Sequence, residues 1–221
     1  MRCASVASKS RTPCIYALAG TNGAGKSSIG GAMLIARGTE YFNPDEAAAR
    51  IRTADPSISQ EEAQSAAWRH GKRLLERVIA ERLDYAFETT LGGNTIPALL
   101  EKALAEGIEV RIWYVGLASA EVHIARVRSR VAHGGHDIPE RKIRERYALS
   151  ILNLIRLLPR LTELRVYDNS YEADPHTGAA PEPQLIVHLK RHKIVAMLDL
   201  TLTPGWAKPV VLAALKTAGG G

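Results

Sequence analysis

The chain has 221 residues, a length that suits one α/β domain or one domain with a small appendage. Its 46% hydrophobic content is typical of a globular core, and its net charge of +6 favours polyanionic partners such as nucleotides, sugar nucleotides or nucleic acid. The two cysteines, Cys3 and Cys14, have neither metal-ligand nor C-x-x-C spacing, and no stretch approaches the length of a transmembrane helix. We therefore expect a cytoplasmic protein without membrane association.

The first predicted element is a short buried strand at residues 15–19, after a Ser- and Arg-rich segment, 1–13, that is predicted to be a disordered tail. The sequence "GTNGAGKS" follows and fits G-x-x-x-x-G-K-[ST] at every fixed position. Helical spacing of apolar residues after it completes the strand–turn–helix setting of a P-loop, which a chance glycine-rich turn would lack. The loop is predicted to bind ATP and Mg²⁺, with Ser27 on Mg²⁺ and contacts from Gly20, Asn22, Gly23, Ala24, Gly25, Lys26, Ser27 and Ser28.

A second short strand is predicted at residues 39–42, and the polar sequence Asn43-Pro44-Asp45 follows it. Ligands of open α/β sheets bind beyond the carboxyl ends of the strands, so Asp45 is a candidate general base for a substrate hydroxyl. The structural alternative makes Asp45 the N-cap of a helix over residues 46–52. Both roles are compatible.

A helix is predicted at residues 60–83, and a strand at 85–88 runs into "TTLGG". Glu88, at the end of this strand, can orient Mg²⁺ through water in Walker-B fashion. With Thr89 and Thr90 it also forms a candidate substrate-binding group. The structural alternative is a polar strand end before a glycine turn.

The next elements are a helix at residues 95–106, a strand at 109–117, and helices at 119–132 and 139–158 joined by Gly134-Gly135. The two basic helices and their glycine hinge are typical of a lid that closes over phosphates, at about residues 126–146. Most of the lid arginines are expected on a solvated face, with two or three in contact with ligand. His133 and His136 are interpreted as polar lid contacts or exposed residues rather than as metal ligands.

A strand at residues 163–170, a Pro/Asp/Gly loop at 171–183 and a hairpin of strands at 184–189 and 192–198 complete the chain, before a frayed end. The alternation of strands and helices predicts an α/β P-loop NTPase fold with a parallel sheet, helices on both faces, an Arg-rich helical lid and a small C-terminal β-hairpin. Residues 14–170 are predicted to be the kinase domain, and 171–221 to pack on it.

Four blocks in order give the chain a resemblance to the zeta-toxin family, and to its short bacterial members: "GTNGAGKSS", "FNPDEAA", "FETTLGG" and "RVAHGGHDIPERKIRERY". The resemblance covers about residues 14–170. It implies a P-loop kinase, and the characterised toxins phosphorylate the 3′-hydroxyl of a UDP-linked amino sugar. The larger toxins lack the Gly-Gly-His run and carry extra helices. A toxin of this kind usually pairs with an antitoxin protein.

By motif, Lys26 and Ser27 resemble the family's ATP and Mg²⁺ residues, and Asp45 resembles its general base. Glu88 and Thr90 resemble residues that hold the sugar. Catalytic arginines on the transferred phosphate correspond to Arg126 or Arg130, joined by a second lid arginine, Arg141 or Arg144. Arg141 is also a candidate substrate ligand, as is Asp45.

Three functions stay open on the sequence. The first is a small-molecule kinase of zeta-toxin type with a sugar-nucleotide substrate. The second is a P-loop kinase for another hydroxyl, including a nucleic-acid 5′-hydroxyl, although no aromatic residues interleave with the arginines as a base-stacking platform would require. The third is a nucleotide-gated binding module, which would need no general base at Asp45.

Overall fold

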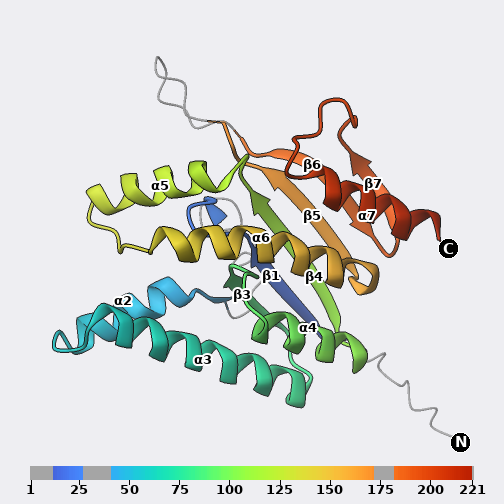
Figure 1. The fold of residues 1–221 in the computed structure, drawn as a ribbon. Coiled ribbons are helices and arrows are strands. Elements are labelled where there is room, and N and C mark those ends of the chain that lie inside the picture. The colour runs from blue at the N-terminus through green and yellow to red at the C-terminus, as the bar shows by residue number, and fades with distance from the viewer. Residues whose placement is uncertain (1–11, 27–40, 172–181, 221) are drawn as a thin grey trace, which may run out of the picture.

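The computed structural model describes residues 12–26, 41–171 and 182–220. Its strands form one sheet in the order β2-β3-β1-β4-β5-β6-β7 (Figure 1). Their bounds are β1 Cys14–Ala19, β2 Tyr41–Phe42, β3 Tyr85–Thr89, β4 Glu109–Gly116, β5 Glu163–Asp168, β6 Gln184–Lys190 and β7 Lys193–Met197. β1 to β5 pair in parallel, whereas β6 and β7 add antiparallel strands at one edge.

The central position of β1 places the P-loop at the middle of the sheet. β1 pairs with β3 on one side and with β4 on the other, so its backbone is hydrogen-bonded along both edges. Because parallel strands end at the same edge of a sheet, the segments that follow β1, β2 and β3 converge there. These segments carry the P-loop, Asp45 and Glu88.

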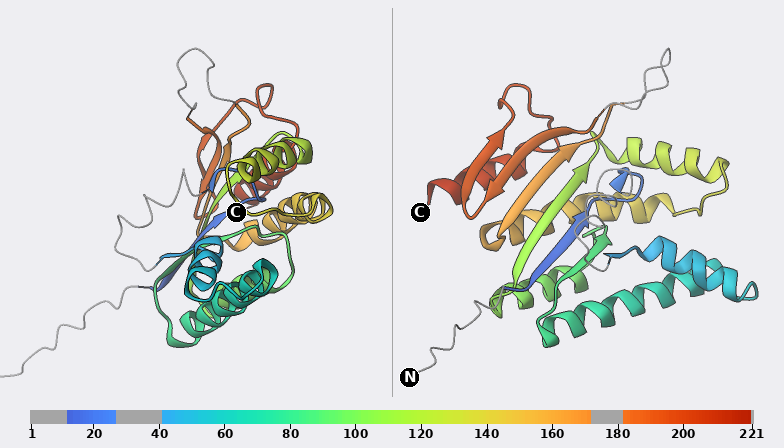
Figure 2. Two further views of the ribbon diagram at one scale, coloured as in Figure 1. Left: turned by 90° about the vertical axis from the view of Figure 1, so that its left-hand side faces the viewer. Right: turned by 180° about the vertical axis from the view of Figure 1, so that it is seen from behind.

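The described helices are α2 (Pro44–Ala54), α3 (Gln60–Glu81), α4 (Thr95–Ala105), α5 (Ala120–Ala132), α6 (Glu140–Leu157) and α7 (Lys208–Gly219). A short 3₁₀ turn, η1 (Leu158–Arg160), follows α6. Several begin at local sequence signals, such as the capping box of Ser59 and Glu62 at the start of α3. Beyond the carboxyl ends of the strands, α5 and the first part of α6 run side by side, and the rest of α6 crosses one face of the sheet (Figures 1 and 2).

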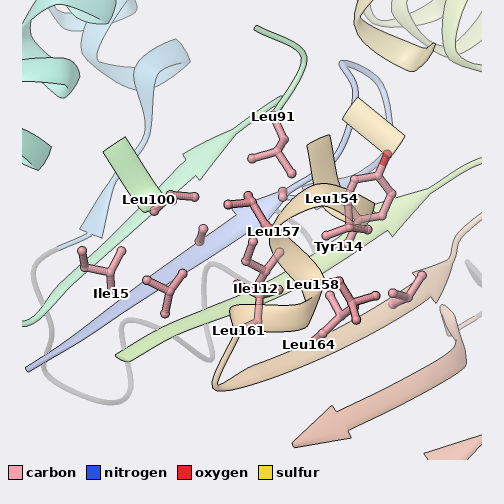
Figure 3. Packing of buried hydrophobic residues seen from close by; sticks show 14 of the residues in the cluster. Ile15, Leu91, Leu100, Ile112, Tyr114, Leu154, Leu157, Leu158, Leu161 and Leu164 are labelled. Atoms are coloured by element: carbon pink, nitrogen blue, oxygen red, sulfur yellow. The ribbon is translucent and has the colours of Figure 1, made fainter. Parts of the chain in front are cut away.

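The main core lies between one face of the sheet and α3, α4, α6 and α7. Alternate strand residues, including Ile15, Ile112 and Leu164, point into it and meet Leu100 of α4 and Leu154 of α6 (Figure 3). On the other face, Leu18, Trp113 and Val115 form a smaller buried cluster. The core therefore fixes the strand ends from which the candidate site is built.

The helix that was predicted after the P-loop lies outside the described residues.

The C-terminal region departs from the prediction. The hairpin of β6 and β7 is confirmed, but residues 208–219 form α7, a helix that was not predicted and that includes three of the five terminal residues, 217–221, predicted to be frayed. Val210, Val211 and Ala214 of α7 are fully buried, and the Trp206 ring lies against Gly116, where a Cβ atom would meet it at 2.2 Å. The sequence "KPVVLAALK" offers apolar residues at helical spacing after a proline, a signal that was overlooked.

Parts of two predicted segments lie outside the described residues: positions 1–11 of the tail, and positions 172–181 of the loop after β5. The division into a tail, a kinase domain and a C-terminal part stays a prediction. Within the described ranges, no helix is both long enough and apolar enough to cross a membrane.

Candidate active site

The P-loop has a backbone that only glycine adopts without strain. Gly20, Gly23 and Gly25 have φ angles of 141°, 84° and 82°. A Cβ atom on Gly20 would lie 2.1 Å from the Val115 carbonyl oxygen, and one on Gly25 would lie 2.6 Å from Asn169 Nδ2. The loop therefore approaches the ends of β4 and β5 more closely than any side chain allows.

Neighbouring elements hold this loop from three sides. Gly20 N donates to the Thr89 carbonyl at 3.2 Å, and Asn169 Nδ2 donates to the Ala24 carbonyl at 2.9 Å. From α5, His123 Nδ1 lies 2.8 Å from the Asn22 carbonyl oxygen. Because that oxygen only accepts, His123 carries its proton on Nδ1. The shape of the loop is thus set before any anion binds.

Lys26 lies half-buried at the end of the loop. Burial lowers the pKa of its ammonium group, the carboxylates of Glu88 and Asp45 raise it, and Arg130 and Arg146 lower it. The same five side chains therefore share one electrostatic environment, and they come from separate elements of the chain.

Asp45 lies in the first turn of α2, but it is not the cap of that helix. The cap is Asn43, whose Oδ1 accepts from the backbone N of Asp45 at 2.9 Å. The structural alternative for Asp45 is therefore wrong, because Pro44 already occupies the first helical position. The carboxylate of Asp45 is 44% exposed and lies 3.8 Å from His136 Nε2 and 4.0 Å from Arg130 Nη1.

Glu88 lies at the end of β3, where it is buried. Its carboxylate accepts from the Tyr41 hydroxyl and from Asn43 Nδ2, the latter at 3.4 Å. The next two side chains shape the turn that follows, since Thr89 Oγ1 accepts from Leu91 N at 3.0 Å and Thr90 Oγ1 accepts from Gly92 N at 3.3 Å. The Thr89 carbonyl accepts from Gly20 N of the P-loop, and Glu88 acts on the Lys26 ammonium group, whereas the roles of Glu88, Thr89 and Thr90 as substrate ligands stay predictions.

The lid arginines fall into two groups. Arg128, Arg141 and Arg144 pair on the surface with Glu140, Glu145 and Glu121, respectively. Arg130 and Arg146 turn inward, Arg130 toward Asp45 and Arg146 toward the P-loop, where its Nη1 donates to Asn22 Oδ1 at 2.8 Å. Arg126 belongs to neither group, and its Nη2 donates to the Tyr171 carbonyl at 3.1 Å.

The structure therefore does not bring Arg141 to the site, because its guanidinium lies 2.6 Å from Glu145 Oε1 on a side chain that is 77% exposed. Its role as a substrate ligand stays a prediction. Ser27 and Ser28 lie outside the described residues, so their roles also stay predictions.

Sequence reasoning did not single out two residues of this site, Arg146 and His123. Arg146 lies three residues after Ile143 and four before Ser150, both of which are buried on the inner face of α6. His123 lies four residues before Val127, on the buried stripe of α5. Both residues share the helical spacing of the buried positions, and this spacing was the signal that could have identified them. It was hard to recognise because one side chain is charged and the other is polar.

The cluster formed by Lys26, Asp45, Glu88, Arg130, His136 and Arg146 fits the phosphates of a nucleotide. Its lysine and two arginines face two carboxylates, which leaves positive charge where a polyphosphate would lie. Among the described residues, no group of three or more His, Cys, Asp or Glu side chains could hold a metal ion.

Comparisons with known proteins agree with this geometry. A model of the family described as "Zeta toxin" matches residues 2–169. A protein of Haemophilus influenzae, described as uncharacterised, is 30% identical over 132 residues, which are 58% of this chain and 88% of that protein.

Solved structures share the fold at low sequence identity. A crystal structure of the AvrRxo1-ORF1:AvrRxo1-ORF2 complex with ATP gives a TM-score of 0.64 at 14% identity, over 93% of this chain and 64% of that chain. A structure of the PezAT toxin–antitoxin system of Streptococcus pneumoniae gives 0.54 at 15% identity, over 73% of this chain and 69% of that chain. This chain thus spans about 64% of the length of the AvrRxo1 chain. These likenesses concern the fold alone, and the predicted α/β P-loop NTPase fold is confirmed.

Proposed function

The chain belongs to the zeta toxin family, and on that premise we propose that it is an ATP-dependent kinase. It transfers the γ-phosphate of ATP to a hydroxyl group of a UDP-linked amino sugar or a related metabolite. The observation that carries this proposal is the position of Asp45: a partly exposed carboxylate faces two inward-pointing lid groups and shares the electrostatic environment of the P-loop lysine.

The P-loop and the lid supply the binding site for ATP. The backbone N–H groups of the loop surround the phosphates, and Lys26 supplies a cation to the β- and γ-phosphates. We assign Ser27 as a ligand of Mg²⁺ and Glu88 as a residue that orients Mg²⁺ through water. When Mg²⁺ is bound, it neutralises charge on the phosphate oxygens. The ATP in the AvrRxo1 complex supports ATP as the donor.

Asp45 acts as the general base. The acceptor's O–H bond breaks and its proton moves to the Asp45 carboxylate, while the acceptor oxygen forms a bond to the γ-phosphorus. The bond from that phosphorus to the bridging oxygen breaks, and its electron pair leaves with ADP. Arg130 and Arg146, with Arg126 at the edge of the site, balance the charge on the transferred group.

The acceptor lies on the side of the site formed by Asp45, Glu88, Thr89 and Thr90. The buried Glu88 carboxylate is held by Tyr41 and Asn43, so it can orient a hydroxyl-rich ligand without moving. A sugar offers several hydroxyl groups to such carboxylates and threonines. This chemistry, together with the family, is the basis for a sugar-nucleotide acceptor.

An antitoxin protein is the proposed partner. The PezAT structure belongs to a toxin–antitoxin system, and the AvrRxo1 structure is a complex of two proteins. Either supports a partner of this kind for a chain with the same fold.

Nucleic acid is disfavoured as the acceptor. Arg128, Arg141 and Arg144 are neutralised by neighbouring glutamates, so these lid residues do not offer the unpaired basic face that a phosphate backbone requires. A nucleotide-gated binding module is disfavoured because such a module needs no base for a substrate hydroxyl.

The test uses the full chain, ATP labelled on the γ-phosphate, Mg²⁺, a panel of UDP-linked sugars and 5′-hydroxyl oligonucleotides. Label on a UDP-linked amino sugar supports the proposal. Label on an oligonucleotide identifies a different kinase, and binding of ATP without transfer to any member of the panel favours the binding module. Lys26→Ala serves as the inactive control.

A further inference from the structure

The two carboxylate oxygens of Asp45 face different groups of the lid. Oδ2 lies 4.0 Å from Arg130 Nη1, whereas Oδ1 lies 3.8 Å from His136 Nε2. The proposed transfer reaction uses Arg130 for charge and Asp45 for the proton. It assigns nothing to His136, although this imidazole lies next to the proposed base.

The loop between α5 and α6 is built to hold His136 in this place. Arg130 Nη2 donates to the His136 carbonyl at 3.1 Å. This contact requires glycine at position 135, because a Cβ atom there would lie 2.7 Å from Arg130 Cγ and 2.9 Å from the Arg130 carbonyl oxygen. Gly135 therefore acts through close packing as well as through the flexibility of a hinge.

The tautomer of His136 follows from its contacts. Arg130 Nη2 lies 3.5 Å from His136 Nε2, and a guanidinium group has donors only. Nε2 is therefore the unprotonated nitrogen, and Nδ1 carries the proton. The same atom, Nε2, faces Asp45 Oδ1. Both atoms are acceptors, so a single proton placed between them would be shared by the two.

The surroundings of His136 keep its imidazole neutral and in contact with solvent. Burial lowers its pKa, as do Arg130 of α5 and Arg146 of α6, whereas Asp45 of α2 and Asp137 of the loop raise it. Its side chain is 19% exposed. A neutral ring at pH 7 can accept a proton and can then release it to water.

We propose that His136 is the second proton acceptor of the transfer reaction. This inference rests on the proposed function. Asp45 takes the proton of the acceptor hydroxyl on Oδ1, His136 Nε2 then takes it from Asp45, and the imidazolium releases it to solvent. Asp45 returns to its ionised form without exchanging a proton directly with bulk water.

Two physical arguments support this path. The Asp45 carboxylate raises the pKa of His136, so it stabilises the imidazolium that forms when Nε2 takes the proton. The 3.8 Å separation is long for a hydrogen bond. Catalytic hydrogen bonds are often long before substrate binds and shorten in the reacting complex.

The first test measures the coupling without turnover. NMR titration of the histidine ring signals in the full chain gives the pKa of His136 in the parent and in Asp45→Asn. Loss of the carboxylate should lower the pKa of His136. The exposed His133, whose Nδ1 lies 2.8 Å from the Ser129 carbonyl oxygen, forms no ion pair with Asp45 among the described residues, and its ring signal serves as the internal control. A His136 that titrates alike in both proteins overturns the inference, even if the chain phosphorylates its acceptor.

The second test is the pH profile of kcat with labelled ATP and a UDP-linked amino sugar. In the parent, kcat should fall as the pH drops through the pKa of His136, because an imidazolium beside Asp45 cannot accept a proton. His136→Gln should lower kcat by up to about 10²-fold, leave the KM for ATP unchanged and move the acidic limb to lower pH. His133→Gln should keep the parental profile.

An acidic limb that stays in place in His136→Gln contradicts the inference. Circular dichroism of each variant shows whether the fold is intact. Failure of the proposed function can be told apart from failure of this inference. If the parent protein transfers phosphate to no acceptor, the proposed function fails before the histidine variants are compared.

Discussion

The P-loop and the lid reach the same phosphate site but are held there in different ways. The P-loop is fixed by a backbone hydrogen bond to β3, by Asn169 and by glycines that pack against β4 and against Asn169 after β5. The inward-facing lid arginines are held through their guanidinium groups, Arg130 by the His136 carbonyl near Asp45 and Arg146 by Asn22. The loop is thus preorganised for binding, whereas the lid must exchange its present partners for phosphate oxygens. Loop variants should therefore change ATP affinity, and lid variants should change kcat more than affinity.

The largest effect is expected for Lys26→Ala. Loss of the cation at the β- and γ-phosphates should weaken ATP binding and lower kcat by about 10³-fold while the fold survives. Isothermal titration calorimetry and circular dichroism measure the two properties. The exposed Lys142 of α6 supplies the matched control, since Lys142→Ala removes the same charge outside the site. Equal ATP affinity in the two variants would remove Lys26 from the phosphate site.

Arg146→Ala should have the next largest effect. It should lower kcat by about 10²-fold and change ATP affinity by less, because Arg146 reaches the phosphates only after it leaves Asn22. Arg144→Ala is the control: its guanidinium pairs with the exposed Glu121, and such a pair contributes about 0–1 kcal/mol. Steady-state kinetics gives kcat for both variants. Equal losses of kcat would contradict the division of the lid arginines into a surface group and an inward-facing group.

His123 should make the stability of the protein depend on pH. Burial is the main cause that lowers its pKa from 6.5 to about 4, so between these values the unfolded chain binds more protons than the folded one. The contribution of neutral His123 to the free energy of unfolding is therefore fully present above pH 6.5, and it falls as the pH drops toward 4. The expected loss between pH 7.5 and pH 5 is about 2 kcal/mol.

Urea unfolding at these two pH values measures the effect. His123→Gln retains an amide donor for the Asn22 carbonyl but has no titrating group, so its stability should change less over the same range. A pH dependence identical to that of the parent would assign the effect to another group.

Local sequence was sufficient for the parts of the site that depend on motifs. The P-loop glycines, Asp45 and Glu88 follow three predicted strands, and parallel pairing brings such strand ends together whatever the details of packing. The strands β1 to β5 and the described helices α2 to α6 also follow from hydrophobic periodicity, because each helix has a buried face.

Tertiary packing decided the rest. Which lid arginines turn inward depends on how α5 and α6 meet the P-loop, and adjacent arginines in a basic sequence look alike before that contact exists. Asn43 displaces Asp45 as the cap of α2 because Pro44 starts the helix. The helix α7 was not predicted, and its apolar residues Val210, Val211 and Ala214 become a buried face only where they pack in the main core.

Asp45→Asn tests the central claim most directly. Asparagine keeps the size of the side chain but cannot take a proton from a hydroxyl, and the cap of α2 at Asn43 is untouched. Transfer of labelled γ-phosphate to the acceptor should fall by about 10²–10⁴-fold while ATP affinity barely changes. The exposed Asp55, at the other end of the same helix, provides the control Asp55→Asn, which should transfer phosphate at the parental rate. Transfer by Asp45→Asn at that same rate would contradict the account of this chain as a kinase with Asp45 as its base.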